Sequence, residues 1–230
     1  MSIGEYRKIG TELMRLLELE NPPVAISFMD RPPAGLRRNA EAAASGCVFW
    51  MRGFKDSFYT DRTDHANCNI GSFTHGFLSP EEMSVETAPD VKLFQDTGYF
   101  PLSEFRKVPR MDKPPKYVAY GPLQETQFEP DIVLIVCTPQ QAMLIAEAVK
   151  SPKLMGAPAC GAIPLACKDG NVGVNLGCIT SRIRTGIKPS ELIVTIPKKE
   201  FQSFLENLRA RVDANNKVAQ AVTAMLNSSK

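Results

Sequence analysis

Short apolar runs, separated by polar or proline-rich turns, set the pattern of this chain. Five of them predict β-strands, at residues 24–29, 117–122, 131–137, 171–177 and 191–196. The run DIVLIVC at 131–137 is apolar at successive positions, which is typical of a strand covered on both faces. We therefore expect an α/β (or α+β) fold in which a single domain, residues 1–230, holds a mixed β-sheet covered by helices.

Helical periodicity occupies much of the sequence between these runs. Apolar residues three and four positions apart predict an amphipathic helix over residues 3–20. Thr138-Pro139 is a typical helix start, and it predicts a helix over 138–150. This helix and another over 198–212 are expected to cover the faces of the sheet.

Two further helices are indicated by local signals. The segment from residue 38 is rich in alanine and predicts a helix that breaks near Ser45-Gly46. Ser79 with Glu82 three residues later forms a capping-box pattern, which predicts a helix over 79–87 that ends before Pro89. The segment after Pro89 is interpreted as two short helices around Gly98.

The last helical pattern, over 214–227, follows all the strands and covering helices predicted for the domain. Its apolar positions Val218, Val222 and Leu226 form one stripe. We therefore expect a homo-oligomer, most simply a dimer, assembled through this helix or through the proline-rich arm at 101–115.

Composition and charge are those of an ordinary globular protein, and they argue against nucleic-acid binding and membrane spanning. The chain of 230 residues is 43% apolar and 23% charged, with a net charge of +2. No basic tract indicates nucleic acid, and the longest strongly apolar run is too short to cross a membrane. The charged start lacks a signal peptide, so the six cysteines are interpreted as reduced thiols or metal ligands in a cytoplasmic protein.

The stretch from Ala157 to Gly186 carries the most pointed chemistry. It holds Cys160, Cys167 and Cys178 and is dense in glycine. Asp169-Gly170 is a strong turn dipeptide, so IPLACKDGNVGVNL predicts a hairpin that returns the chain toward Cys178. A helix that starts beside Cys178 and carries arginines would give this thiol thiolate character.

Two other cysteines have unusual surroundings. Cys47 directly follows Gly46 and is either a small core residue or a ligand-contacting one. Cys68 lies between His65 and His75, so these three side chains are possible ligands of one metal, although His65 could equally lie on the surface. Cys137 continues an apolar strand and is assigned to the core.

Several of these segments together resemble a known family. They are Pro22-Pro23-Val24-Ala25, Cys47, Cys68-Asn69-Ile70-Gly71, Ala159-Cys160-Gly161 and Gly177-Cys178-Ile179-Thr180-Ser181-Arg182. In this combination the chain is similar to an uncharacterised prokaryotic family, domain of unknown function 169, found in archaea and anaerobic bacteria. The resemblance implies a cytoplasmic protein tied to anaerobic metabolism and implies no established activity.

Three functions follow from the residues. In the first, Cys47, Cys68, Cys160 and Cys178 bind an iron–sulfur cluster in a redox or metal-binding protein; Gly71, Gly161 and Gly177 keep the pocket wall bare, and Arg182 balances negative charge. In the second, a domain without catalysis binds a small anionic molecule. In the third, Cys178 is the nucleophile of a thiol enzyme. We favour the first, and whether the chain is an enzyme stays open.

Overall fold

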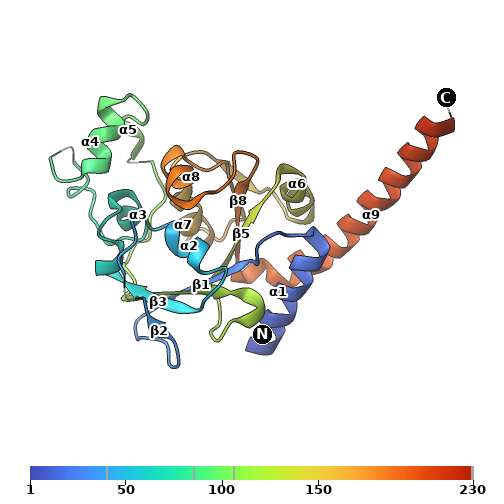
Figure 1. Cartoon of the computed structure of the whole chain (residues 1–230), viewed down its shortest axis with the longest axis horizontal. Coiled ribbons are helices and arrows are strands. Elements are labelled where there is room, and N and C mark those ends of the chain that lie inside the picture. The colour runs from blue at the N-terminus through green and yellow to red at the C-terminus, as the bar shows by residue number, and fades with distance from the viewer. Residues whose placement is uncertain (40, 85, 106, 229–230) are drawn as a thin grey trace.

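An eight-stranded mixed sheet forms the centre of the molecule (Figure 1). The computed structural model describes residues 1–230 except 40, 85, 106 and 229–230. The strands lie in the order β2-β3-β4-β1-β5-β8-β7-β6. Their bounds are β1 Val24–Met29, β2 Arg37–Arg38, β3 Phe58–Asp61, β4 Tyr117–Pro122, β5 Ile132–Cys137, β6 Lys153–Met155, β7 Gly173–Asn175 and β8 Leu192–Pro197. Neighbouring strands are antiparallel except for the two edge pairs β2–β3 and β6–β7, which are parallel.

Alternate residues of the central strands face two separate layers of helices. On β5, Leu134 and Val136 enter one core cluster, whereas Val133 and Ile135 enter the other. Successive side chains of a strand point to opposite faces, so a strand that is apolar throughout supplies both layers at once. This is why DIVLIVC has no polar position after its first residue.

One layer consists of three longer helices. They are α1 Ile3–Leu17, α6 Pro139–Ala148 and α9 Phe201–Ser228. Apolar side chains of each helix pack against the sheet, among them Leu13, Ile145 and Phe204. Arg209 ties α9 to α1 through a bidentate ion pair with Glu12, with both N–O distances 2.6 Å.

The opposite layer is built from short helices and loops, and it contains the candidate site. Its helices are α2 Val48–Arg52, α3 Asn69–Thr74, α4 Pro89–Asp96, α5 Leu102–Phe105, α7 Ala162–Cys167 and α8 Ile179–Thr185, together with 3-10 turns at Arg62–His65 and Ala159–Gly161. The other two 3-10 turns, Leu123–Glu125 and Lys198–Glu200, lie beside α1 and α9. Phe49, Trp50 and Ile163 fill the core between this layer and the sheet. Short helices leave many helix ends, and several of these ends meet at one place.

The fold class predicted from the sequence is confirmed: one α/β domain with a mixed, helix-covered sheet. The strands predicted at 24–29, 117–122, 131–137 and 191–196 correspond to β1, β4, β5 and β8, within one residue at each end. The strand predicted at 171–177 is present as the shorter β7. The edge strands β2 and β6 were not predicted, because a pair of arginines and a three-residue segment give no periodicity.

The predicted hairpin through Asp169-Gly170 is wrong. The apolar run before it forms helix α7, not a strand. Gly170 adopts a φ of +63° and donates its N–H to the carbonyl of Ala166, so the dipeptide ends a helix. A six-residue apolar run is compatible with either a buried strand or a buried helix, and the turn dipeptide did not distinguish them.

Two predicted helices are also absent from the described residues. The alanine-rich segment before Ser45 is irregular, with Ala40 outside the described residues, and a helix this short is marginal without packing. Ser79 and Glu82 make both capping-box hydrogen bonds, yet turns follow instead of a helix, and Val85 lies outside the described residues. The hydroxyl of Thr87 donates to the carbonyl of Glu82, which competes with helical bonding.

The C-terminal segments predicted as helices over 198–212 and 214–227 form one continuous helix, α9. Its first half packs on the sheet, and its second half extends away from the rest of the molecule (Figure 1). Across the described residues, no helix has both the length and the apolar character needed to cross a membrane.

Candidate functional site

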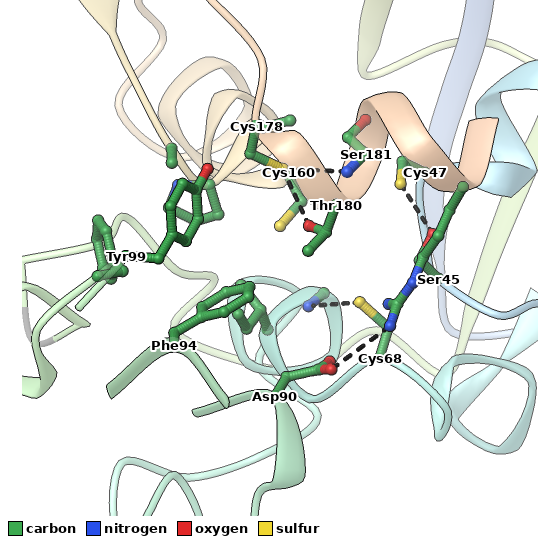
Figure 2. Close-up of a pocket in the computed structure, with 18 of the residues that line it drawn as sticks. Ser45, Cys47, Cys68, Asp90, Phe94, Tyr99, Cys160, Cys178, Thr180 and Ser181 are labelled. Carbon is green, nitrogen blue, oxygen red and sulfur yellow. Dashed lines mark hydrogen bonds and ion pairs between the residues drawn. The ribbon is translucent and has the colours of Figure 1, made fainter. Parts of the chain in front are cut away.

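A narrow pocket, with a cavity volume of about 30 Å³, opens among the short helices. Four cysteines from four separate segments line it: Cys47, Cys68, Cys160 and Cys178 (Figure 2). These are the four that the sequence singled out as ligands of a cluster. Segments 113 to 131 positions apart, such as those of Cys47 and Cys160 or Cys178, are therefore neighbours at one face of the sheet.

Two of the four cysteines cap helices that begin at the pocket. The Sγ of Cys68 accepts the N–H of Gly71 at 3.2 Å at the start of α3. The Sγ of Cys178 accepts the N–H of Ser181 at 3.4 Å at the start of α8. A cap normally uses an oxygen, so sulfur in this position presents a polarised thiol to whatever occupies the pocket.

The other two cysteines are held differently. Cys47 precedes α2, and its Sγ lies 3.0 Å from the hydroxyl of Ser45. Cys160 lies in the 3-10 turn that leads into α7. The turn follows a loop anchored by the buried Asn175, whose amide donates to the carbonyls of Gly156 and Pro158 at 2.8 and 3.3 Å.

Burial favours the neutral thiol form of three of these cysteines. Burial raises the pKa of Cys47, raises that of Cys68 to about 11, and raises that of Cys160 well above its usual value. The nearby thiols add to the shift of Cys160, since a second thiolate would repel the first. Hydroxyls of Ser45 and Ser181 act in the opposite direction on Cys47.

The Ser181 hydroxyl is an unusual polar group in this wall. It is buried, lines the pocket, and has no hydrogen-bond partner of ordinary geometry among the described residues. A buried hydroxyl without a partner loses free energy that a bound molecule would restore. In the sequence, only the position of Ser181 near a predicted helix start indicates this role.

Aromatic rings form the side of the pocket that faces the thiols. Phe94 and Tyr99 lie opposite the cysteines in Figure 2, and Phe100 and Phe105 also line the pocket. The Tyr99 hydroxyl accepts the N–H of Ile179 at 3.1 Å, which ties the aromatic segment to the helix that Cys178 caps. Sequence reasoning missed this wall, because Phe94, Tyr99 and Phe100 lie in a segment interpreted only as short helices, and Phe105 lies in the proline-rich arm at 101–115.

The charged pair in the pocket is also different from the expected one. Arg184 lines the pocket and pairs with Asp90 at 3.6 Å, whereas Arg182 points away. The guanidinium of Arg182 donates to the carbonyl of Leu176 at 2.7 Å and to that of Glu191 at 2.9 Å. Residues two apart on a helix point in widely different directions, so only one arginine of the pair can face the thiols.

The predicted glycines divide in the same way. Gly71 lines the pocket, and a Cβ there would lie 3.0 Å from the Sγ of Cys68. Gly161 faces Met155 instead, and Gly177 faces Arg182. Gly177 adopts a φ of +86°, a backbone conformation that glycine tolerates best. Gly161, Gly177 and Arg182 therefore shape the loops around the pocket without lining it.

Both histidines are buried behind the pocket wall. The rings of His65 and His75 lie 5.0 Å apart, and neither lines the pocket. Burial lowers the pKa of His75 to about 4 and lowers that of His65 well below its usual value. His65 is thus a core residue rather than the surface residue considered from the sequence.

The side chains around the pocket are not arranged as a site for a single metal ion. They include no group of three or more His, Cys, Asp or Glu side chains placed to hold a single metal ion. The remaining cysteines, Cys137 and Cys167, do not line the pocket. Cys137 belongs to the core on the other face of the sheet, which confirms its assignment.

Comparisons with known proteins agree with the resemblance noted from the sequence. The family model of domain of unknown function 169, described as "Uncharacterised ArCR", matches residues 12–207. A protein of Methanocaldococcus jannaschii, "Uncharacterized protein MJ0308", is 27% identical over 225 residues, covering 90% of this chain and 94% of that protein. No solved structure matches the chain significantly. The family match spans all four pocket cysteines, and the chain belongs to the domain of unknown function 169 family.

Proposed function

We propose that the pocket holds a soft-metal cofactor, an iron–sulfur cluster, bound by Cys47, Cys68, Cys160 and Cys178. The observation that carries the proposal is the meeting of these four thiols, from four segments, around one mostly apolar pocket. Thiolates are the ligands that iron–sulfur clusters require, and four of them complete the usual ligand set.

A cluster of several metal ions suits the four thiols better than a single metal ion does. A single zinc ion needs all its sulfur ligands about 2.3 Å from one point. The four thiols line one pocket, yet the described residues offer no group of three or more ligands placed to hold one ion. A polynuclear centre, in which each thiolate binds a different metal, suits such an arrangement.

The groups around the thiols suit a cluster as well. Backbone N–H groups of Gly71 and Ser181 already donate to sulfur, and hydrogen bonds of this kind tune a cluster. Aromatic rings line the side of the pocket that faces the thiols, and they would keep water away from a bound cluster. Such a centre would place the protein in a reducing compartment, consistent with six free cysteines.

A thiol enzyme that uses Cys178 has less support. A cysteine nucleophile is usually activated by a histidine within hydrogen-bond reach. Both histidines are buried behind the wall, and the hydroxyl of Thr180, 3.3 Å from the Cys178 Sγ, is not a base. Binding of a small anion is less favoured because Arg184 is already paired with Asp90.

Reconstitution without oxygen tests the proposal. The full chain is incubated with ferrous iron and sulfide, desalted, and measured for visible absorbance. We expect a chromophore in the wild-type protein and its loss in Cys178→Ser. Cys167→Ser is the matched control, since Cys167 is half-buried outside the pocket, and it should keep the chromophore. Equal spectra for the two variants would contradict the assignment.

A further inference from the structure

The second half of α9 is a helix without packing from the body of the chain. Val218, Val222 and Leu226 are 62, 47 and 64% exposed. They continue a stripe that begins in the body: Leu205, Val212, Ala219 and Leu226 are spaced by seven, as are Leu208, Asn215 and Val222. The stripe packs on the sheet in the first half of the helix and faces solvent in the second.

This half of the helix is poorly suited to stand alone in water. From residue 218 to residue 228 it contains no charged residue, so no ion pair supports those turns. Isolated helices of this length are marginal even with good helix formers. An uncharged, apolar helix face is typical of the buried centre of a protein interface.

A groove lined by both apolar and polar side chains lies where α9 leaves the body. Its walls come from α1, α6 and α9 and include Leu16, Met143, Leu144, Val212 and Ala219. Glu18 is the single charged residue among the described residues that line it. The α9 wall of the groove is the same stripe, so helix and groove offer one continuous surface.

We propose that a second copy of this chain covers the stripe, with the second halves of the two α9 helices packed antiparallel across a twofold axis. The exposed helix face and the groove occur on the same chain, so one twofold operation satisfies both copies at once. In this arrangement residues 213–228, about 24 Å of helix, overlap fully. The tip of each helix then reaches the groove at the base of the other.

The low charge of this segment favours a second copy of the chain, and not a membrane surface, as the partner of the stripe. Helices that bind lipid surfaces carry lysine and arginine along the polar face. The described part of this segment has one such residue, Lys217, and its side chain pairs with Asp213 at 2.5 Å.

Sedimentation of the full-length protein tests the proposal. The wild-type protein should be a dimer at micromolar concentration. Val222→Lys buries a charge in the pair and should raise the dimer dissociation constant at least about tenfold. Ala224→Lys, on the opposite face of the helix, is the control and should leave it unchanged.

Circular dichroism adds a second readout. Dilution of the wild-type protein below its dissociation constant should lower helicity as the free ends of α9 fray, while Val222→Lys should show the lower helicity at all concentrations. A wild-type monomer at tens of micromolar, or equal dimerisation of both variants, would overturn the proposal. Binding of that monomer to vesicles of anionic lipid would assign the stripe to a membrane instead.

Discussion

Individual cysteines of this chain differ in what their sulfur contacts. The four pocket thiols lie beside hydroxyls, backbone N–H groups or one another, whereas Cys137 lies among apolar side chains of β5, α6 and α9. Burial raises the pKa of Cys137 to about 12, so it is a neutral, small apolar residue. The two classes are expected to respond differently to the same substitution.

Cys137→Ser should lower stability without affecting the cofactor. The change buries a hydroxyl in an apolar environment, with an expected loss of roughly 1–3 kcal/mol in the free energy of unfolding. Denaturant titration measures the loss, and anaerobic reconstitution of the folded variant measures the cofactor. An unchanged free energy of unfolding, or loss of the cofactor, would contradict the assignment of Cys137 to the core.

Asn175 should be essential to the loops that carry two of the thiols. Its side chain holds the carbonyls of Gly156 and Pro158 and accepts the N–H of Gly177 at 2.6 Å. Asn175→Ala leaves these buried groups unsatisfied and should lower stability by about 1–3 kcal/mol. Thermal unfolding should show little change for the control Asn171→Ala, whose side chain makes one long, exposed contact.

His75 should make the protein less stable in acid. Its pKa is about 4 in the folded protein because of burial, and about 6.5 when unfolded. The unfolded state therefore binds the proton first, so stability is complete above pH 6.5 and falls as the pH drops toward 4, by about 3 kcal/mol. His75→Asn should flatten this fall in urea titrations between pH 7 and 4; an identical fall would contradict it.

At the scale of elements, the sequence predicted those whose periodicity and end signals agree. For α6, Thr138 makes both capping-box hydrogen bonds at the start of an apolar run that packs on the sheet. The Ser79 capping box is just as complete, yet β-branched and hydroxyl residues follow it and no helix forms in the described residues. A cap indicates where a helix can begin, and packing decides whether it continues.

The loop between β7 and α8 supplies a test of backbone geometry. Gly177 has a φ of +86°, and an added Cβ would lie 3.2 Å from the guanidinium of Arg182. Gly177→Ala should therefore lower stability by about 1–2 kcal/mol. Gly156→Ala is the control, since nothing lies within 4 Å of its added Cβ and its φ is not positive. Equal melting temperatures for the two variants would contradict the account.

At the scale of the whole molecule, the sequence identified the pocket cysteines better than it identified the rest of the pocket. Glycine or hydroxyl residues beside Cys47, Cys68, Cys160 and Cys178 were a local signal. The ring of Phe94 and the guanidinium of Arg184 gave none, because their place depends on how α4 and α8 pack. Because residues two apart on a helix point in different directions, Arg182 contacts the loop carbonyls and Arg184 lines the pocket.

Iron and acid-labile sulfide analysis of the protein isolated without oxygen shows whether the four pocket thiols hold a cluster. We expect iron and sulfide in equal amounts, several atoms of each per chain, in the wild-type protein and in Cys167→Ser. We expect neither element above background in Cys68→Ser or Cys160→Ser. Wild-type protein that takes up no iron and sulfide under these conditions, or pocket variants that retain both, would contradict the claim that the four thiols hold a cluster.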